Sequence, residues 1–329
     1  MSAIVTERQD NDSPLWLGLD LSTQSLTLVL LSDTPGAPPV YVDSLQYAQD
    51  LPHYNTEHGM HIRDGDNGEK ASYDNAVVTS PVTMWVDALD IILSRLAFST
   101  KEQPDKCGST GKAKDGYSGK GGDGGDEPMT GSATWGSSVL GRVRAVSVSG
   151  QQHGTVYWKC GAGKTLAAMA ELDRKTTLLD ALHGCFARQD CPIWADSSTT
   201  KECIALEQAL GGAKGVADAT GSAAYCRFSG NQIARIARLE PTVYTSCERV
   251  SLVSSFLTGV LAGCHCPVDA ADASGMNLMD IRTLDWHEGA LAATGAEGLQ
   301  EKLGQISDSY ATVGEISPFF TRKFGINPR

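Results

Sequence analysis

Ser149-Gly150-Gln151-Gln152-His153-Gly154 is the stretch on which the fold and the candidate site of this 329-residue chain depend. An alternating apolar run over residues 143–148 precedes it and predicts a buried strand. Two glycines bracket two amides and an imidazole, so the end of this strand presents side chains that both donate and accept hydrogen bonds. Such a set suits a polyol better than an ion. The alternative is a polar turn whose glutamines and histidine cap nearby backbone groups.

Composition limits the classes of protein to which the chain can belong. A net charge of -12 disfavours nucleic-acid binding, and 41% hydrophobic residues support a sizeable core. No run of 18 apolar residues occurs, so we expect no membrane span. The polar N-terminus lacks the apolar core of a signal peptide, and the nine cysteines follow no repeating frame. We therefore expect reduced thiols and a cytoplasmic protein.

The first apolar segments predict a β-hairpin with a polar tip. Residues 15–20 form a strand that ends in Asp20, a Ser/Thr/Gln turn follows, and residues 26–31 form the second strand. Hydroxyls and backbone N–H groups at such a tip can cradle a phosphate. The carboxylate of Asp20 beside the tip can hold Mg²⁺ directly or through water. The alternative is an ordinary hairpin with a solvated tip.

Three helices are predicted from their start signals and apolar spacing. Ser80 is expected as the N-cap of the first, with Pro81 at its first helical position. Thr199 and Glu202 have the spacing of a capping box that opens the second. Residues 248–262 are expected to be helical throughout.

Two further polar groups have open interpretations. Arg227 lies among apolar neighbours, so we expect it to have a partner, which is either a structural carboxylate or a ligand. Cys264-His265-Cys266 has metal-ligand residue types without a second ligand pair at matching spacing, which favours a buried apolar turn.

The domain organisation follows from one change in composition. Residues 101–138 are rich in Gly, Lys, Asp and Ser and contain very few large apolar residues, which predicts a disordered insert. Residues 1–13 are expected to be a flexible tail. The remainder, residues 14–329, is expected to form one domain around that insert.

Taken in order, these motifs resemble the FGGY family of carbohydrate kinases, and within it the xylulokinase branch of eukaryotic type. The resemblance covers nearly the whole chain outside the insert. The segment from Ser149 to Gly154 and the segment Arg227-Phe228-Ser229-Gly230-Asn231-Gln232 are its most specific parts. The other matching segments are residues 18–25, 80–85, 157–158, 194–199 and 272–275.

The resemblance implies an α/β fold of actin-like ATPase (ribonuclease-H-like) type, with a mixed sheet flanked by helices. A family member has two such domains; the N-terminal one binds a ketopentose and the second holds most of the ATP. The implied reaction transfers the γ-phosphoryl group of MgATP to the 5-hydroxyl of D-xylulose, and no partner other than the small-molecule sugar is implied.

The resemblance also assigns roles to individual residues. His153 and Arg227 would contact the sugar, and Gln152 would line the pocket beside them. Asp20 would organise the Mg²⁺ ion, and Ser22 and Thr23 would lie near the transferring phosphoryl group. Phosphoryl transfer depends mostly on positioning and charge stabilisation, which suits this division of roles.

One departure from the family pattern concerns the general base. In the family it is an aspartate of a Gly-Asp-Asn motif, on a strand that follows a segment like residues 314–325. This sequence stops at Arg329, where that strand should begin, and Gly65-Asp66-Asn67 lies in an early loop that does not match. We therefore expect a sugar-binding half that lacks the base and the second ATPase domain and is inactive by itself. The alternative is a non-catalytic sugar-binding or regulatory module.

Overall fold

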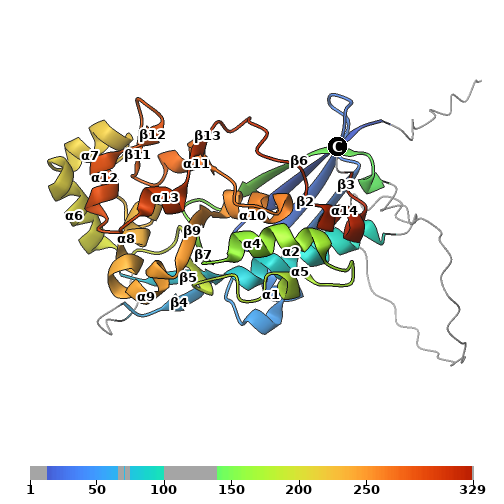
Figure 1. Ribbon diagram of the computed structural model, residues 1–329, viewed down its shortest axis with the longest axis horizontal. Coiled ribbons are helices and arrows are strands. Elements are labelled where there is room, and N and C mark those ends of the chain that lie inside the picture. The colour runs from blue at the N-terminus through green and yellow to red at the C-terminus, as the bar shows by residue number, and fades with distance from the viewer. Residues whose placement is uncertain (1–12, 66–69, 71–74, 100–138, 328–329) are drawn as a thin grey trace, which may run out of the picture.

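The structure is a computed structural model that describes residues 13–65, 70, 75–99 and 139–327. It has a mixed α/β arrangement in two parts, a sheet with its covering helices and a smaller, mainly helical lobe (Figure 1). The expected insert at 101–138, all but the last residue of the expected tail, and Asp66-Asn67 lie outside the described residues.

The strands and helices alternate along much of the chain. The strands are β1 (Leu15–Leu21), β2 (Ser25–Ser32), β3 (Tyr41–Gln46), β4 (His61–Arg63), β5 (Val77–Pro81), β6 (Val143–Gly150), β7 (Thr155–Lys159), β8 (Asp190–Pro192), β9 (Cys247–Leu252), β10 (Val268–Asp269), β11 (Met279–Asp280), β12 (Asp285–Trp286) and β13 (Ile306–Ser307). The helices are α1 (Tyr47–Asp50), η1 (Pro52–Tyr54), α2 (Val82–Ala97), α4 (Ala162–Ala168), η2 (Met169–Glu171), α5 (Leu178–Ala181), α6 (Thr200–Leu210), α7 (Ala213–Thr220), α8 (Ser229–Leu239), α9 (Pro241–Thr245), α10 (Val253–Ala262), α11 (Ala270–Ser274), α12 (Glu288–Ala293), α13 (Leu299–Leu303) and α14 (Pro318–Phe324).

The largest described sheet has the strand order β3-β2-β1-β6. The predicted hairpin is confirmed, because β1 and β2 pair antiparallel with Asp20 opposite Thr27. β6 then pairs parallel with β1 and places Ser149 beside Asp20. The parallel pairing brings the ends of β1 and β6 to the same edge of the sheet, where the hairpin tip also lies.

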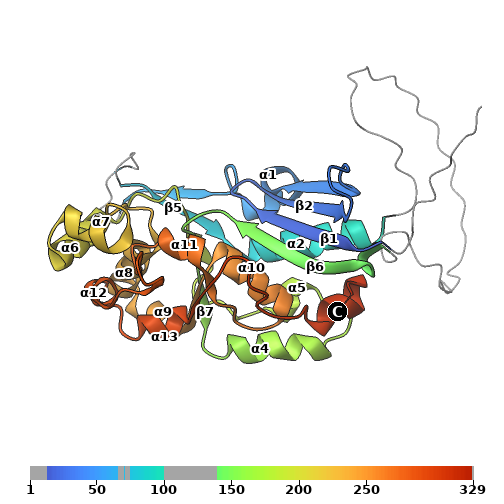
Figure 2. The same cartoon turned by 90° about the horizontal axis from the view of Figure 1, so that it is seen from above.

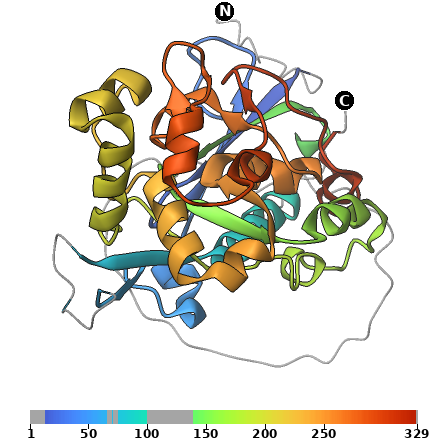
Figure 3. The same ribbon diagram turned by 60° about the vertical axis from the view of Figure 1, so that its left-hand side comes forward.

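Two hydrophobic cores hold the described residues together. Alternate residues of β1 and β2 turn inward and pack with α2, α10 and α14, and Trp85 of α2 is fully buried there. Figure 2 shows α2 and α10 stacked under the sheet, with α4 farther out. The second core lies among α6, α8, β9, α12 and α13, in the lobe that comes forward in Figure 3. None of the described helices is both long and apolar enough to cross a bilayer.

The predicted strand before Gly150 is present, but the prediction that it is buried is wrong. Val143 is buried, whereas Arg144, Ala145, Ser147 and Ser149 are exposed. In the described part of the sheet, β6 is an edge strand. Open space beside its outer edge leaves both of its faces accessible to solvent.

The predicted first helix starts one residue later than expected. Ser80 and Pro81 belong to β5, and α2 begins at Val82 without a side-chain cap. The hydroxyl of Ser80 donates instead to the carbonyl of Gly59 at 2.8 Å. The Ser80 hydroxyl, which the local pattern predicts as a helix cap, therefore bonds to a residue distant in the sequence instead.

Two other helix predictions need correction for the same reason. The hydroxyl of Thr199, at the start of α6, donates to the carbonyl of Cys226 at 2.5 Å rather than capping the helix. Glu202 pairs with Arg238 at 2.6 Å. Residues 247–252 form β9, not the start of a helix, because they pair antiparallel with β7; only α10 is helical.

Candidate functional site

Asp20 is exposed at the end of β1 and accepts hydrogen bonds on both carboxylate oxygens. The hydroxyl of Ser149 donates to Oδ1 at 2.7 Å, and the hydroxyl of Ser22 donates to Oδ2 at 2.6 Å. These two bonds fix the orientation of the carboxylate while leaving one lone pair on each oxygen. Asp20 is therefore oriented but still able to coordinate a cation.

Thr23, at the hairpin tip, connects three segments of the chain. The indole N–H of Trp194 donates to its hydroxyl at 2.8 Å, and that hydroxyl donates to Oε1 of Gln151 at 3.2 Å. The backbone N–H of Gln151 also donates to the carbonyl of Leu21 at 2.8 Å, which extends the pairing of β6 with β1. The tip is thus held against the turn that follows β6.

The glycine at the end of β6 is required by a close backbone approach. A Cβ at Gly150 would lie 2.7 Å from the backbone nitrogen of Ser254 and 3.0 Å from the carbonyl carbon of Val253, at the start of α10. Any side chain would force that helix away from the strand. Gly150 therefore sets the direction in which the following Gln-Gln-His segment leaves the sheet.

His153 has a defined tautomer. Its Nδ1 lies 2.8 Å from the carbonyl oxygen of Gly275, which can only accept, so Nδ1 carries the proton and Nε2 is left as the acceptor. Burial lowers the pKa of His153 and nearby Arg227 lowers it further, against the opposing effect of the Gly275 bond. The ring also packs against Phe228, with centroids 4.6 Å apart.

Arg227 has no carboxylate partner among the described residues, so the structural partner anticipated for it is not found there. Its guanidinium lies over the Tyr225 ring, 5.5 Å from the centroid. The side chain is exposed and its hydrogen-bond donors face open space. The Tyr225 ring supports one face of the guanidinium and leaves its donors available for hydrogen bonding.

All six residues singled out from the sequence line one open cleft of about 460 Å³. These are Asp20, Ser22, Thr23, Gln152, His153 and Arg227. The cleft lies between the hairpin tip, the turn after β6 and the segment before α8. Three parts of the chain that are more than 70 residues apart thus meet at one place, although nothing in the geometry by itself assigns a role to each residue.

The structure adds Gln151 and Trp194 to the lining of this cleft. Gln151 is nine-tenths buried, and its Nε2 has no hydrogen-bond partner. Trp194 is 43% exposed, which is unusual for so large an apolar side chain. The sequence carried a signal for both, because Gln151 belongs to the opening motif and Trp194 precedes the polar segment 196–199.

Asp196, close to Trp194 in sequence, is a structural residue. It is 1% exposed, and its oxygens accept from Val78 N–H at 2.8 Å, from Ser198 and from the amide of Gln232 at 2.6 Å. It ties β5 to α8. Its carboxylate faces protein groups, so it is not positioned to act on a ligand in the cleft.

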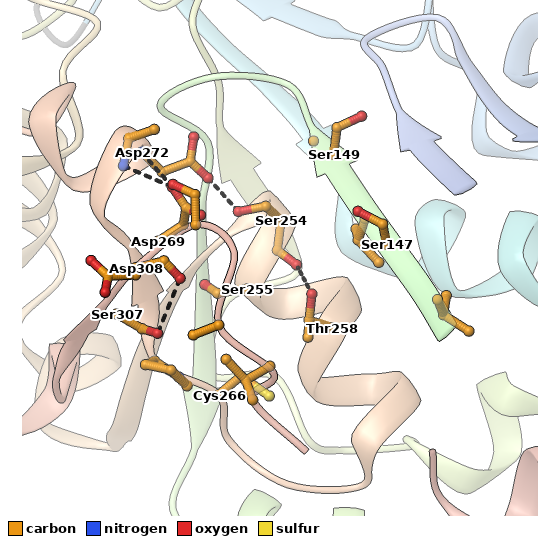
Figure 4. A pocket seen from close by; sticks show the side chains of 18 residues that line it. Ser147, Ser149, Ser254, Ser255, Thr258, Cys266, Asp269, Asp272, Ser307 and Asp308 are labelled. Atoms are coloured by element: carbon orange, nitrogen blue, oxygen red, sulfur yellow. Dashed lines mark hydrogen bonds between the residues drawn. The ribbon is translucent and has the colours of Figure 1, made fainter. Parts of the chain in front are cut away.

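A second cleft runs along the outer edge of β6. Figure 4 shows Ser147 and Ser149 of β6 on one side, and Ser254 and Thr258 of α10 with Asp272 on the other. The hydroxyl of Ser254 donates to the carboxylate of Asp272. Burial raises the pKa of Asp272. The cleft continues past Val143 to Asn327, whose backbone N–H donates to the carbonyl of Leu140 at 3.3 Å.

The described residues contain no group of three or more His, Cys, Asp and Glu side chains that could hold a metal ion by themselves. His265 of the Cys-His-Cys segment instead contacts Glu248, with Nε2 3.0 Å from Oε1. Asp20 is accordingly a single carboxylate ligand at most.

A family model described as the N-terminal domain of the FGGY family of carbohydrate kinases matches residues 167–329. The xylulose kinase of Rattus norvegicus is 38% identical over 312 residues, which are 95% of this chain and 48% of that protein. The chain therefore spans about half the length of the curated relatives it matches.

The fold is that of sugar kinases of actin-like ATPase type. A crystal structure of xylulose kinase from Rhodospirillum rubrum superposes with a TM-score of 0.61 at 14% identity, over 95% of this chain and 47% of that one. A gluconate kinase from Lactobacillus acidophilus superposes with a TM-score of 0.60 at 14% identity, over 96% of this chain and 46% of that one. Fold likeness alone therefore does not select the sugar.

Proposed function

Because the chain belongs to the FGGY family of carbohydrate kinases, we propose that it is the sugar-binding half of a D-xylulose kinase. The reaction is the transfer of the γ-phosphoryl group of ATP to the 5-hydroxyl of D-xylulose. The observation that supports this best is the cleft that gathers Asp20, His153 and Arg227. A phosphate-binding tip and a polyol-binding turn must be neighbours in a sugar kinase, and here they share one cavity.

The proposed roles follow from the hydrogen-bond donors and acceptors that line the cleft. Nε2 of neutral His153 accepts a hydrogen bond from a sugar hydroxyl, because Nδ1 is committed to Gly275. Arg227 donates to sugar oxygens from its position over Tyr225. The exposed amide of Gln152 supplies further donors. Together these groups orient the ketopentose with respect to the hairpin tip.

The residues at the tip fit a Mg²⁺ ion held with a nucleotide. Mg²⁺ favours one or two carboxylates together with water and phosphate oxygens over an all-protein cage, and Asp20 is a single oriented carboxylate. Bound MgATP supplies the phosphoryl group and neutralises its charge. Ser22 and Thr23 keep the tip in place: Ser22 holds the Asp20 carboxylate, and Thr23 connects Trp194 to Gln151.

We place the general base on a strand that pairs with the open edge of β6. The relatives are about twice as long, and Asn327 already lies at the start of that edge. A strand there would lie two strand spacings from β1, which is about 10 Å. A carboxylate from its end could then reach a hydroxyl held between His153 and Asp20.

Binding of D-xylulose to the 329-residue chain tests the proposal. We expect weak binding by calorimetry, reduced about tenfold by His153→Ala and by Arg227→Ala, since each substitution removes a hydrogen bond of about 1.5 kcal/mol. His183→Ala and Arg282→Ala are matched controls at exposed sites away from the cleft, and both should bind normally. Equal binding by all four variants would reject the cleft as the sugar site.

Turnover separates a kinase half from a regulatory sugar-binding module. We expect no sugar-dependent ADP release from the 329 residues alone, and D-xylulose phosphorylation by the chain extended to the length of its relatives. An inactive extended chain that still binds D-xylulose would favour the module. Preference for gluconate or glycerol over D-xylulose would point to another kinase of the family.

A further inference from the structure

Two cysteines lie close together beside the segment that carries Arg227. Cys203 is buried in α6, and Cys226 is half-buried in the turn before α8. Their sulfur atoms are 4.0 Å apart, and the Cys203 thiol donates to Cys226 Sγ. A disulfide needs an S–S distance of about 2.05 Å. The two sulfur atoms therefore have to approach each other by about a further 2 Å to form the bond.

The surroundings of the two thiols make them chemically different. Cys226 Sγ lies at the N-terminal turn of α6, 3.6 Å from Oγ1 of Thr200. The positive end of a helix dipole stabilises a thiolate. The bond from Cys203, with help from the hydroxyls of Thr200 and Thr199, lowers the pKa of Cys226. Contact with Cys226 and burial raise the pKa of Cys203. Cys226 is therefore the nucleophile and Cys203 the protonated partner.

Among the described cysteines, Cys264 and Cys266 also interact through their thiols. The thiols of Cys191 and Cys247 donate to the carbonyls of Thr155 and Arg249. The thiol of Cys266 also contacts the carbonyl of Cys264, at 3.9 Å. Cys191 and Cys247 thus serve as comparison thiols that bond to carbonyl groups.

We propose that Cys226 and Cys203 form a redox pair that hydroperoxides convert to a reversible disulfide. The Cys226 thiolate attacks the peroxide O–O bond, which gives a sulfenic acid and hydroxide. The Cys203 thiol then attacks that sulfur, forms the S–S bond and releases water. Overall, two thiols are oxidised by two electrons and one hydrogen peroxide is reduced to two waters. A dithiol reverses the reaction by exchange.

The position of the pair connects it to the cleft, a consequence that rests on the proposed function. Tyr225 supports Arg227, and Phe228 packs against His153, so Cys226 sits inside the segment that positions both sugar ligands. Its carbonyl is held by Thr199 and Gln232. Drawing the Cys226 side chain toward α6 pulls on that segment.

Peptide mapping tests the proposal directly, because trypsin separates the two cysteines. Cleavage after Lys201, Lys214 and Arg227 leaves Cys203 on residues 202–214 and Cys226 on residues 215–227. After brief hydrogen peroxide treatment of the dilute chain, alkylation and non-reducing mass spectrometry, we expect these two peptides joined with the loss of two hydrogens. Dithiothreitol should restore both free peptides. Recovery of both cysteines fully alkylated after peroxide would overturn the proposal.

Single serine variants identify the order of events. Cys203→Ser should leave a sulfenic acid at Cys226 that dimedone traps, whereas Cys226→Ser should leave Cys203 unoxidised. Iodoacetamide should label Cys226 at a lower pH than is usual for a thiol, and exposed Cys160 serves as the labelling reference. Sulfenic acid at Cys160 in place of Cys226 would refute the assignment. Disulfide formation does not depend on sugar binding. The result of the peptide map is therefore independent of whether the proposed kinase function is correct.

Discussion

Asp196→Ala is expected to destabilise the fold strongly without removing a reacting group. The carboxylate is 1% exposed and accepts from Val78 N–H at 2.8 Å and from the Gln232 amide at 2.6 Å, both in the interior. Each buried donor left without a partner costs about 1–3 kcal/mol. Ser198 is only half-buried, so the two interior donors alone give a loss of roughly 4 kcal/mol. For a chain of this size that lowers the melting temperature by about 10 °C.

Differential scanning calorimetry of the 329-residue chain measures this loss. The matched control is Asp218→Ala, which removes an exposed ion pair with Lys214 and should leave the melting temperature unchanged. Because Gln232 also holds the carbonyl of Cys226, sugar affinity should fall together with stability. An unchanged melting temperature, with loss of turnover in the extended kinase, would refute the structural role and make Asp196 a candidate base.

Four further outcomes are expected. Burial lowers the pKa of His153 below its ordinary value of 6.5. The unfolded state then binds a proton before the folded state does, so the free energy of unfolding should be highest above pH 6.5 and should fall as the pH drops toward the folded-state pKa. Urea titrations from pH 7.5 to 5 should show this dependence, and His153→Gln should flatten it. Asp20→Asn in the extended kinase should lower kcat about 100-fold at saturating sugar, and an unchanged kcat would remove Asp20 from the chemistry. Replacing residues 101–138 with a short Gly/Ser linker should leave the melting temperature within about 3 °C, and a larger loss would show that they dock on the fold. Oxidising Cys203 and Cys226 should weaken D-xylulose binding about fivefold in the same calorimetric titration, about 1 kcal/mol, reversibly with dithiothreitol.

Local patterns predicted strands and the order of the motifs well, because alternation and turn residues report directly on the backbone. The hairpin of β1 and β2 and the strand before Gly150 are where the sequence places them. Secondary-structure predictions were wrong where pairing with a segment distant in the sequence determined the local structure. Leu252 lies at helical spacing from Phe256 and Val260, but pairing with β7 makes residues 247–252 a strand.

The candidate site was partly predictable for a similar reason. Asp20, His153 and Arg227 carry unusual chemistry at strand or helix ends, which a sequence displays. Gln151 and Trp194 were missed because the local sequence does not show their surroundings. The buried Nε2 of Gln151 has no hydrogen-bond partner, and the indole of Trp194 donates to Thr23, which is 171 residues away in the chain. The helix-capping predictions at Ser80 and Thr199 failed similarly, since both hydroxyls bond across the fold.

The parallel register of β1 and β6 explains why the site forms at all. Asp20 lies opposite Ser149 and Leu21 opposite Gly150, so the polar turn begins at the level of the hairpin tip. A slip of one residue would invert the side chains of β6 and remove the Ser149 hydroxyl from Asp20. It would also break the bond from Gln151 N–H to Leu21, which continues the ladder into the turn. The start of α10 can approach β6 closely at Gly150 because this residue has no side chain. The packing of α10 and the register of β6 on β1 therefore require the same alignment. Asp20 and the Gln151-Gln152-His153 turn are therefore positioned by one set of backbone contacts.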